Sequence, residues 1–297
     1  MRTGVVWEVL ERLGVRARSV VCLRDLAVGE NGNWLVEAVD GERVVLRRYH
    51  AGAGREDLRY EHAVLRHVAR AGWVVPEPVG PLVRHGDRWW CLNRFVPGQA
   101  RGEETPAEQR QRGRDLARLE VALRGLGERL GQRPGWQAQH TAVTVHTGID
   151  WDEEVEEFAK THPRLAAWAS RAAVETRSAS ELPVTVVHGD FASWNVHYVG
   201  DQLAGVVDFG LTHLDSRPYE LAIARTYRAP GVIQGFQEEL SRLGWPLSDL
   251  EVAAIEPLHR AFRVDMVAWQ LHQGRQNGSY DTAMIERQLT KSGIPVP

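Results

Sequence analysis

The segment with the clearest chemical potential runs from Val186 to Gly210 and reads VVHGDFASWNVHYVGDQLAGVVDFG. It holds an H-x-D motif ending at Asp190, Asn195 five residues later, and a D-F-G motif that begins with Asp208. Phosphoryl transfer needs such residues, because the protein mainly positions the reactants and holds metal ions beside the charged oxygens. Asp190 is the predicted catalytic carboxylate, which accepts or orients the proton of an attacking hydroxyl. Asn195 and Asp208 are the predicted Mg²⁺ ligands, since Mg²⁺ prefers hard oxygen donors.

The specificity of this signal comes from the combination of its parts. A lone D-F-G or H-G-D is weak, because an Asp or Asn in a loop usually caps a turn. Here both occur with an Asn at fixed spacing, a short hairpin between them and two apolar residues before Asp208. That combination indicates a functional site rather than separate residues that cap turns. His188 is predicted to support the catalytic loop rather than to act as a general base.

These motifs resemble the aminoglycoside phosphotransferase and choline kinase superfamily, the small-molecule relatives of protein kinases. The resemblance lies in the H-G-D-x4-N form of the loop, and Leu214 to Ala222 is similar to the family's region that ends in Asp-Leu-Ala. It implies an α+β, protein-kinase-like bilobal fold with a small β-rich N-terminal lobe and a larger, mainly helical C-terminal lobe. It also implies Mg²⁺ as cofactor and ATP or GTP as co-substrate.

The hydrophobic pattern fits this division of the chain. Turn signals at Pro97-Gly98 place the boundary between a nucleotide-binding lobe, residues 1–96, and a catalytic and substrate-binding lobe, residues 97–297. Alternation and turn residues predict strands at 19–26, 34–39, 43–49 and 88–95, with one helix at 56–71. In the second half, strands are predicted at 184–187 and 203–207, and helices at 105–130, 152–169, 219–228, 232–243, 250–273 and 280–289.

The resemblance implies a loop over the phosphates between the first two strands, and Gly29-Glu30-Asn31-Gly32-Asn33 occupies that place. Its candidate nucleotide contacts are Gly29, Asn31, Gly32 and Asn33. Glycine would let backbone N–H groups approach phosphate oxygens. Judged without its position between the first two strands, the segment would be interpreted as an ordinary hairpin turn.

The resemblance also implies a lysine on the third strand, but this chain has Arg47 there. Strand alternation puts Val45 and Arg47 on one face, so Val45 would lie against the base and Arg47 would reach the phosphates, while Arg48 would face solvent. Arginine binds phosphate through its planar fork but does not replace lysine in reach or geometry. Glu61 on the following helix is the predicted acidic partner, in preference to Glu56 in the first turn.

Three further positions follow from the resemblance. The backbone of Arg94, Phe95 and Val96 would form the hinge that hydrogen-bonds the nucleotide base. Glu120 stands where relatives usually have His, and a buried Glu there would need a partner that the sequence does not identify. The acidic run from Asp150 to Glu157 either provides favourable charges for the first turns of a helix or attracts a cationic acceptor.

Composition narrows the function classes. The formal net charge of −3 argues against a nucleic-acid binder. Of 36 basic residues, two are lysines, Lys160 and Lys291. Cys22 and Cys91 lack metal-ligand spacing, and no apolar run approaches the ~18 residues that span a bilayer. We therefore expect a cytoplasmic protein with no membrane or nucleic-acid partner.

The leading hypothesis is an O-phosphotransferase that moves the γ-phosphate to a hydroxyl of a small molecule, an aminoglycoside or similar antibiotic. A metabolic kinase for a small alcohol such as homoserine or choline fits the motifs equally well. A nucleotide-binding pseudokinase is a third possibility, which the joint presence of Asp190, Asn195 and Asp208 disfavours. The oligomeric state cannot be read from the sequence.

Overall fold

The computed structural model describes residues 3–24, 31–145, 148–176 and 181–296. The chain forms two compact units: Met1–Gly102 with Trp194–Gly210, and Glu103–Ser193 with Leu211–Pro297. The chain therefore leaves the second unit after Ser193, contributes a hairpin to the first and returns at Leu211. The lobe boundary between residues 96 and 97 stays a prediction.

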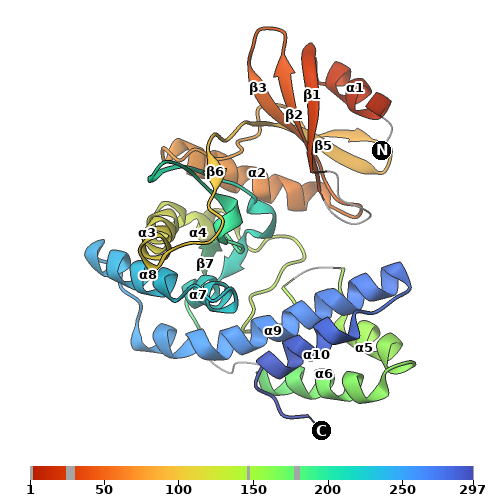
Figure 1. The fold of residues 1–297 in the computed structure, drawn as a ribbon, viewed down its shortest axis with the longest axis vertical. Coiled ribbons are helices and arrows are strands. Elements are labelled where there is room, and N and C mark those ends of the chain that lie inside the picture. The colour runs from red at the N-terminus through yellow and green to blue at the C-terminus, as the bar shows by residue number, and fades with distance from the viewer. Residues whose placement is uncertain (1–2, 25–30, 146–147, 177–180, 297) are drawn as a thin grey trace. The chain divides into compact units, whose positions relative to one another are not determined.

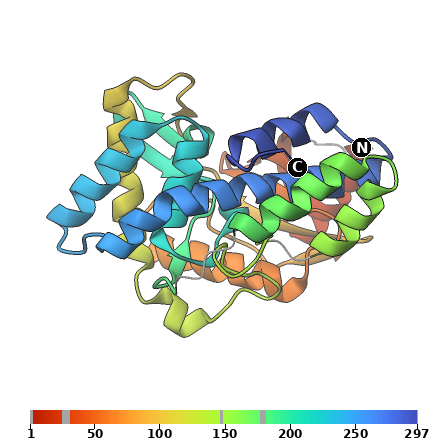
Figure 2. The same ribbon diagram turned by 90° about the horizontal axis from the view of Figure 1, so that it is seen from below.

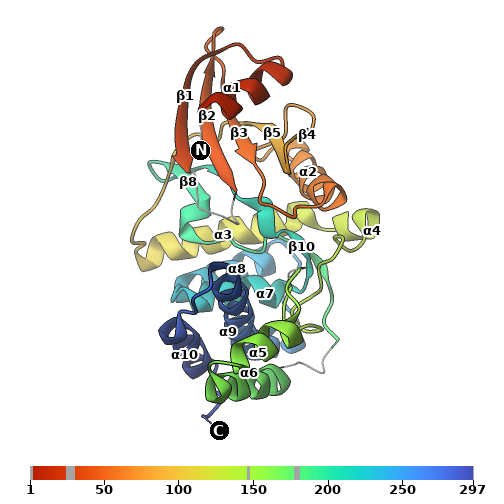
Figure 3. The same ribbon diagram turned by 90° about the vertical axis from the view of Figure 1, so that its right-hand side faces the viewer.

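The first unit is built on an antiparallel five-stranded sheet of order β1-β2-β3-β5-β4 (Figures 1 and 3). The strands are β1 (Ala17–Arg24), β2 (Gly32–Ala38), β3 (Arg43–Arg48), β4 (Val83–His85) and β5 (Arg88–Arg94). The predicted Asp40-Gly41 turn joins β2 and β3, and Gly41 has the positive φ of 88° that such a turn requires.

The two faces of this sheet are covered by different helices. Even-numbered residues of β3 and β5, such as Leu46 and Trp90, pack with residues of α1 (Thr3–Arg12). Cys91 points the other way and packs with Leu58 of α2 (Arg55–Arg70). Since successive strand residues face opposite sides, the odd face of β3, which carries Arg47, is turned toward α2.

A second, three-stranded sheet completes the first unit, in the order β6-β8-β9. It consists of β6 (Gln99–Ala100) and the antiparallel hairpin β8 (Val196–Val199) and β9 (Gln202–Val206). The backbone N–H of Val206 donates to the carbonyl of Val74 at 3.0 Å. This bond fixes the end of β9 two residues before Asp208.

The second unit is mainly helical. Its helices are α3 (Pro106–Leu123), α4 (Leu126–Leu130), α5 (Trp151–Ala159), α6 (Pro163–Thr176), α7 (Arg217–Thr226), α8 (Pro230–Arg242), α9 (Asp249–Asn277) and α10 (Thr282–Lys291). The short antiparallel pair β7 (Thr185–Val187) and β10 (His213–Asp215) lies in the same unit. The predicted α+β fold class, with a β-rich N-terminal part and a mainly helical C-terminal part, is confirmed.

Two predicted helices are each divided in two. The helix expected over 105–130 ends at Leu123, because Gly125 adopts the left-handed conformation with φ 74° and starts α4 in a new direction. The helix expected over 152–169 is broken before Pro163, which has no N–H for the preceding helix and instead opens α6.

The 29-residue α9 is the central element of the second unit. Figure 2 shows it, in blue, alongside the green helices α5 and α6. Phe158, Trp168, Leu271 and Ile285, from four helices, are all buried in one core cluster there. Within the described ranges, no helix is long and apolar enough to cross a membrane.

Candidate active site

The loop that carries Asp190 follows β7, a strand whose last two residues are fully buried. His188 is inaccessible, and its Nδ1 accepts a hydrogen bond from the N–H of Asp190 at 3.2 Å. Gly189 has φ 84°, and a Cβ at this position would lie 2.3 Å from the carbonyl oxygen of Leu211. Only glycine fits this bend, which turns Asp190 out of the buried strand into a half-buried position. The hydrogen bond between His188 and Asp190 is consistent with the predicted supporting role of His188.

Two residues that the sequence did not single out hold this loop. Glu220 of α7 accepts the N–H of Gly189 through Oε1 at 2.8 Å. Arg112 of α3 donates from Nη1 to the carbonyl of Phe191 at 2.7 Å, and its Nε and Nη2 donate to the carboxylate of Glu104. The match of Glu220-Leu221-Ala222 to the family's Asp-Leu-Ala marked the first position, but no sequence signal marked Arg112.

Glu220 is a buried acid in an unusual state. Burial raises its pKa to about 7, against the backbone hydrogen bonds of Gly189 and His188, which lower it. The nearby charges of Asp190 and Asp215 add to the rise. The carboxyl group that anchors the catalytic loop is therefore less acidic than an ordinary glutamate.

The predicted metal ligands, Asn195 and Asp208, belong to the first unit. Asn195 ends a 3₁₀ turn (Ser193–Asn195) and is buried, and its carbonyl accepts the N–H of Val207 at 2.9 Å. Asp208 has the left-handed φ of 61°, uncommon outside glycine, and its side chain is 45% exposed. An amide and an exposed carboxylate, linked through the backbone, are a donor set that fits Mg²⁺ completed by nucleotide oxygens. In the part of the chain that the structure describes, no cluster of three or more His, Cys, Asp or Glu forms another metal site.

Arg47 lies between two acids of the first unit. Its Nη2 is 3.4 Å from Oδ1 of Asp208 and 3.8 Å from Oε1 of Glu61, and both Arg47 and Glu61 are buried. Burial opposes the guanidinium charge, but Glu61 and then Asp208 outweigh it and hold the pKa of Arg47 above its ordinary value. The structure thus brings together Arg47, Glu61 and Asp208. Glu56 instead pairs with Arg59 at 2.7 Å on the exposed first turn.

The prediction for Arg48 was wrong. Its side chain is buried, with the guanidinium over the Trp34 ring at 5.5 Å from the centroid. Arg48 lies at the end of the even face of β3, where Trp34 and Trp90 stack, so cation–π contact replaces hydration there.

The predicted phosphate loop is seen only in part. Gly29 lies outside the described residues. Asn31 accepts the N–H of His50 through Oδ1 at 3.0 Å. Gly32 and Asn33 are not in the loop but open β2, where they pair with Arg48 and Arg47.

The remaining predicted nucleotide contacts lie on β3 and at the end of β5. Val45 is half-buried in β3. Arg94 is exposed, and its N–H already donates to the carbonyl of Glu77 at 2.8 Å. Phe95 is half-buried under the guanidinium of Arg43, and Val96 is buried. Among these three residues, the backbone of Phe95 and Val96 is the part that remains for a base.

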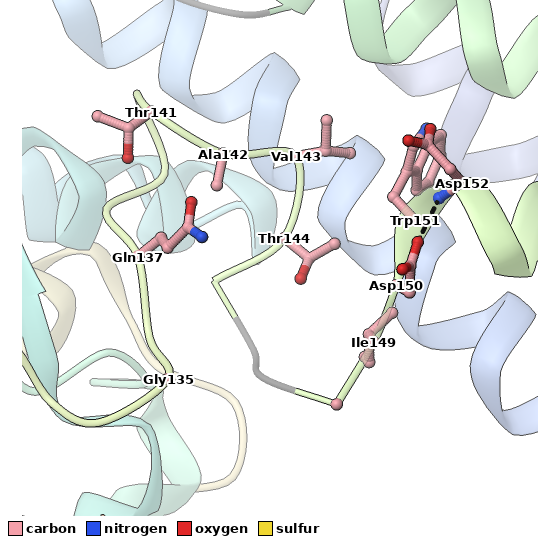
Figure 4. A pocket seen from close by; sticks show the side chains of 11 residues that line it. Gly135, Gln137, Thr141, Ala142, Val143, Thr144, Ile149, Asp150, Trp151 and Asp152 are labelled. Carbon is pink, nitrogen blue, oxygen red and sulfur yellow. Dashed lines mark hydrogen bonds between the residues drawn. The ribbon is translucent and has the colours of Figure 1, made fainter.

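The second unit contains a pocket of about 320 Å³. Figure 4 shows its lining residues, which come from the loop between α4 and α5 and from the start of α5. They are Gly135, Gln137, Thr141, Ala142, Val143, Thr144, Gly148, Ile149, Asp150, Trp151 and Asp152. Two buried carboxylates hold the loop from beneath: Asp215 accepts the N–H of Gln139 at 2.7 Å, and Asp265 accepts the N–H of Val145 at 3.2 Å.

Most of the acidic residues beside this pocket that are described below already form hydrogen bonds or ion pairs within the second unit. Asp150 caps α5 by accepting the N–H groups of Asp152 and Glu153. Glu153 pairs with Arg275 at 2.6 Å, and Glu154 pairs with His272 at 2.8 Å. Asp150 therefore serves the start of the helix, as in the first of the two interpretations. Glu153 and Glu154 instead contact α9, and Asp152 lines the pocket wall.

Comparison with known proteins places this geometry in a family. The profile of the "Phosphotransferase enzyme family" matches residues 23–276. The homoserine kinase of Azorhizobium caulinodans is 27% identical over 264 residues, which cover 82% of this chain and 77% of that protein. The homoserine kinase of Rhizobium rhizogenes is 25% identical over 260 residues, covering 78% and 74%.

Solved structures share the fold at low sequence identity. Amicoumacin kinase in complex with AMP-PNP, Ca²⁺ and its antibiotic superposes with a TM-score of 0.69 at 14% identity, covering 98% of this chain and 93% of that one. Aminoglycoside phosphotransferase APH(4)-Ia gives a TM-score of 0.63 at 17% identity, covering 99% and 97%. The chain therefore belongs to the phosphotransferase enzyme family and is a small-molecule phosphotransferase that acts on hydroxyl groups.

Proposed function

We propose that the chain transfers the γ-phosphate of ATP or GTP to a hydroxyl of a small molecule, with Asp190 as the catalytic carboxylate. The observation that carries this proposal is the construction of the Asp190 loop, which Gly189, His188 and Glu220 hold in one conformation. A half-buried carboxylate fixed in this way can take the proton of an attacking hydroxyl.

The nucleotide side is proposed to lie on the first unit. Asn195 and Asp208 would hold Mg²⁺, which supplies positive charge to the phosphate oxygens when bound. Arg47 would orient the phosphates through its fork, with Glu61 behind it as a buried counter-charge. Asn31, Gly32 and Asn33 would cover the phosphates, and Val45 and the backbone of Phe95 and Val96 would contact the base.

The pocket of the second unit is the proposed acceptor site. Its volume of about 320 Å³ is at the lower end of the ~300–1,000 Å³ of ligand pockets. Its wall offers hydroxyl, amide and carboxylate groups from Thr141, Gln137 and Asp152. A small amino alcohol would fit it well, and the curated relatives that match most of the chain are homoserine kinases. We therefore place a homoserine-like alcohol first among acceptors.

An aminoglycoside or similar antibiotic is the second candidate. The structural neighbours named above are kinases of such compounds, and Asp152 would meet an ammonium group. The pairing of Glu153 and Glu154 with Arg275 of α9 weakens the field that a polycation would need. A catalytically silent pseudokinase is the alternative that the following test excludes.

The test is a coupled nucleotide-turnover assay with ATP and GTP against homoserine, choline and a panel of aminoglycosides, with and without Mg²⁺. Wild type is compared with Asp190→Asn, which keeps the shape, and with Asp201→Asn, a fully exposed site in the β8–β9 turn. Loss of the general base should lower kcat about 100-fold or more with the true acceptor, while Asp201→Asn should match wild type. If wild type turned over no faster than Asp190→Asn with every acceptor, the proposed catalytic role of Asp190 would be wrong.

A further inference from the structure

Glu120 of α3 is a completely buried acid, and neither of its carboxylate oxygens has a hydrogen-bond partner within the described chain. Three charged groups face it: Glu220 and Arg217 from α7 and Glu251 from α9. An ionised carboxylate without a donor is strongly disfavoured in such an environment. The charge state of Glu120 therefore depends on what these three neighbours offer.

Arg217 does not neutralise Glu120, because its guanidinium is committed to Glu251. Its Nε and Nη2 donate to the two carboxylate oxygens of Glu251 at 2.9 and 2.7 Å. Its Nη1 donates to the carbonyl of Trp245 at 2.8 Å, and Nη2 also reaches Pro246. This ion pair is complete, and no other residue that the structure describes donates to the carboxylate oxygens of Glu120 or to Oε2 of Glu220.

Glu220 has donors on one side only. Its Oε1 accepts the N–H of Gly189, whereas Oε2 is buried and has no partner among the described residues. Two buried neighbouring carboxylates cannot both be ionised at ordinary cost, so the pair retains a proton. Hydrogen bonds from the backbone favour the charge on Glu220, and Glu120 has no such bonds. The proton therefore belongs on Glu120.

We propose that Glu120 is a positioning residue: its carboxyl group is protonated and donates a hydrogen bond to Oε2 of Glu220, which keeps Glu220 as the acceptor that fixes Gly189. This inference rests on the proposed catalytic role of Asp190, the next residue along the loop. One proton would satisfy an oxygen on each acid that otherwise has no partner.

Raising the pH removes the proton that Glu120 and Glu220 share. Burial, followed by the charge of Glu220, raises the pKa of Glu120 well above its usual range, and burial together with Asp190 and Asp215 raises that of Glu220. A raised carboxyl pKa means that the stabilisation is present at low pH and is lost as pH rises through the folded-state value. Loss of the shared proton would place two charges side by side beneath the loop. The kcat is therefore expected to fall at alkaline pH.

Infrared spectroscopy of the protein without substrate tests the proton directly. A protonated buried carboxyl gives a carbonyl band that ionised acids lack. Wild type minus Glu120→Gln should show this band at neutral pH, and it should disappear on alkaline titration of wild type. If the difference spectrum held only carboxylate bands, the inference would be overturned, whatever the activity of the protein.

The kinetic test compares pH profiles of kcat and KM for Glu120→Gln, which keeps a donor but cannot ionise, and Glu120→Leu, which removes the donor. The alkaline decline of kcat should vanish in Glu120→Gln. Glu120→Leu should lose about tenfold or more in kcat, with KM changed much less, because a charged acceptor loses its donor. Glu128→Gln, an exposed site on α4, is the control and should keep the wild-type profile. An alkaline decline that persists unchanged in Glu120→Gln, or equal losses in Glu120→Gln and Glu120→Leu, would contradict the role of Glu120.

Discussion

Replacing Asp265 by Asn should change how the stability of the protein depends on pH. Asp265 lies on α9, is 8% exposed, and accepts a hydrogen bond from the N–H of Val145 in the pocket loop. Burial, with a contribution from the charge of Asp215, raises its pKa to about 7 from the ordinary 3.8. Asparagine keeps the shape and one oxygen acceptor but does not titrate.

The size of the effect follows from the pKa difference. A shift of about three pKa units corresponds to about 4 kcal/mol at ~1.4 kcal/mol per unit. Because the folded-state pKa is raised, this stability is fully present below the unfolded-state pKa and declines as pH rises to about 7. Between pH 5 and pH 8, we expect the free energy of unfolding of wild type to fall by about 2.5 kcal/mol relative to that of Asp265→Asn.

The assay is urea unfolding of both proteins at pH 5 and pH 8. Taking the difference between the two proteins at each pH cancels the titration of groups elsewhere. Asp249→Asn, at the exposed first turn of the same helix, is the matched control and should show no pH-dependent difference of this size. A change of less than about 0.5 kcal/mol for Asp265→Asn would refute the assignment of a raised pKa to this carboxyl.

Two smaller predictions concern backbone geometry. Gly189→Ala should lower the free energy of unfolding by about 2 kcal/mol or more and reduce kcat, because its φ is positive and its Cβ would lie 2.3 Å from Leu211 O. Gly200 also has a positive φ but open space around it, so Gly200→Ala measures the cost of φ alone. In urea unfolding, Gly200→Ala should lose less stability than Gly189→Ala. Thr105→Ala should cost about 1 kcal/mol in the same assay, because Thr105 Oγ1 and Glu108 Oε2 form the capping box of α3; a loss near zero would show that the cap does not limit stability.

Much of the fold could be predicted because local signals agreed with the tertiary structure. The helix expected at 56–71 forms at Arg55–Arg70, and the strand expected at 88–95 forms at Arg88–Arg94. α1 was missed because a 10-residue helix gains its stability from packing on the sheet, which no local pattern reveals. β4 and β10 were missed because three-residue strands exist only through their partners.

The candidate site also contains residues that the sequence could predict and residues that it could not. Motif spacing predicted roles for Asp190, Asn195 and Asp208. Alternation placed Arg47 on the face of β3 that lies toward α2, and the family resemblance predicted its contact with Glu61. Alternation also placed Arg48 on the opposite face, but it could not show that this face is covered by Trp34. The supports of the loop, Glu220 and Arg112, act on backbone atoms from helices that are distant in the sequence. The similarity to the family's Asp-Leu-Ala region covers Glu220, but no sequence signal marks Arg112.

Arg47 offers the last test, because its fork contacts two acids that differ in exposure. Asp208 is 45% exposed, so its contact contributes less than about 1 kcal/mol, whereas Glu61 is 2% exposed and would lose a buried counter-charge. Arg47→Met should therefore lower the free energy of unfolding by about 3 kcal/mol, and Arg47→Lys, which keeps the charge, by clearly less. Arg59→Met, at an exposed position of α2, is the control and should lose under about 1 kcal/mol. If Arg47 also orients the phosphates, Mg²⁺ and nucleotide should raise the melting temperature of wild type and Arg59→Met but not of Arg47→Met. A nucleotide-induced shift of wild-type size in Arg47→Met would show that the arginine supports the fold of its unit and takes no part in binding.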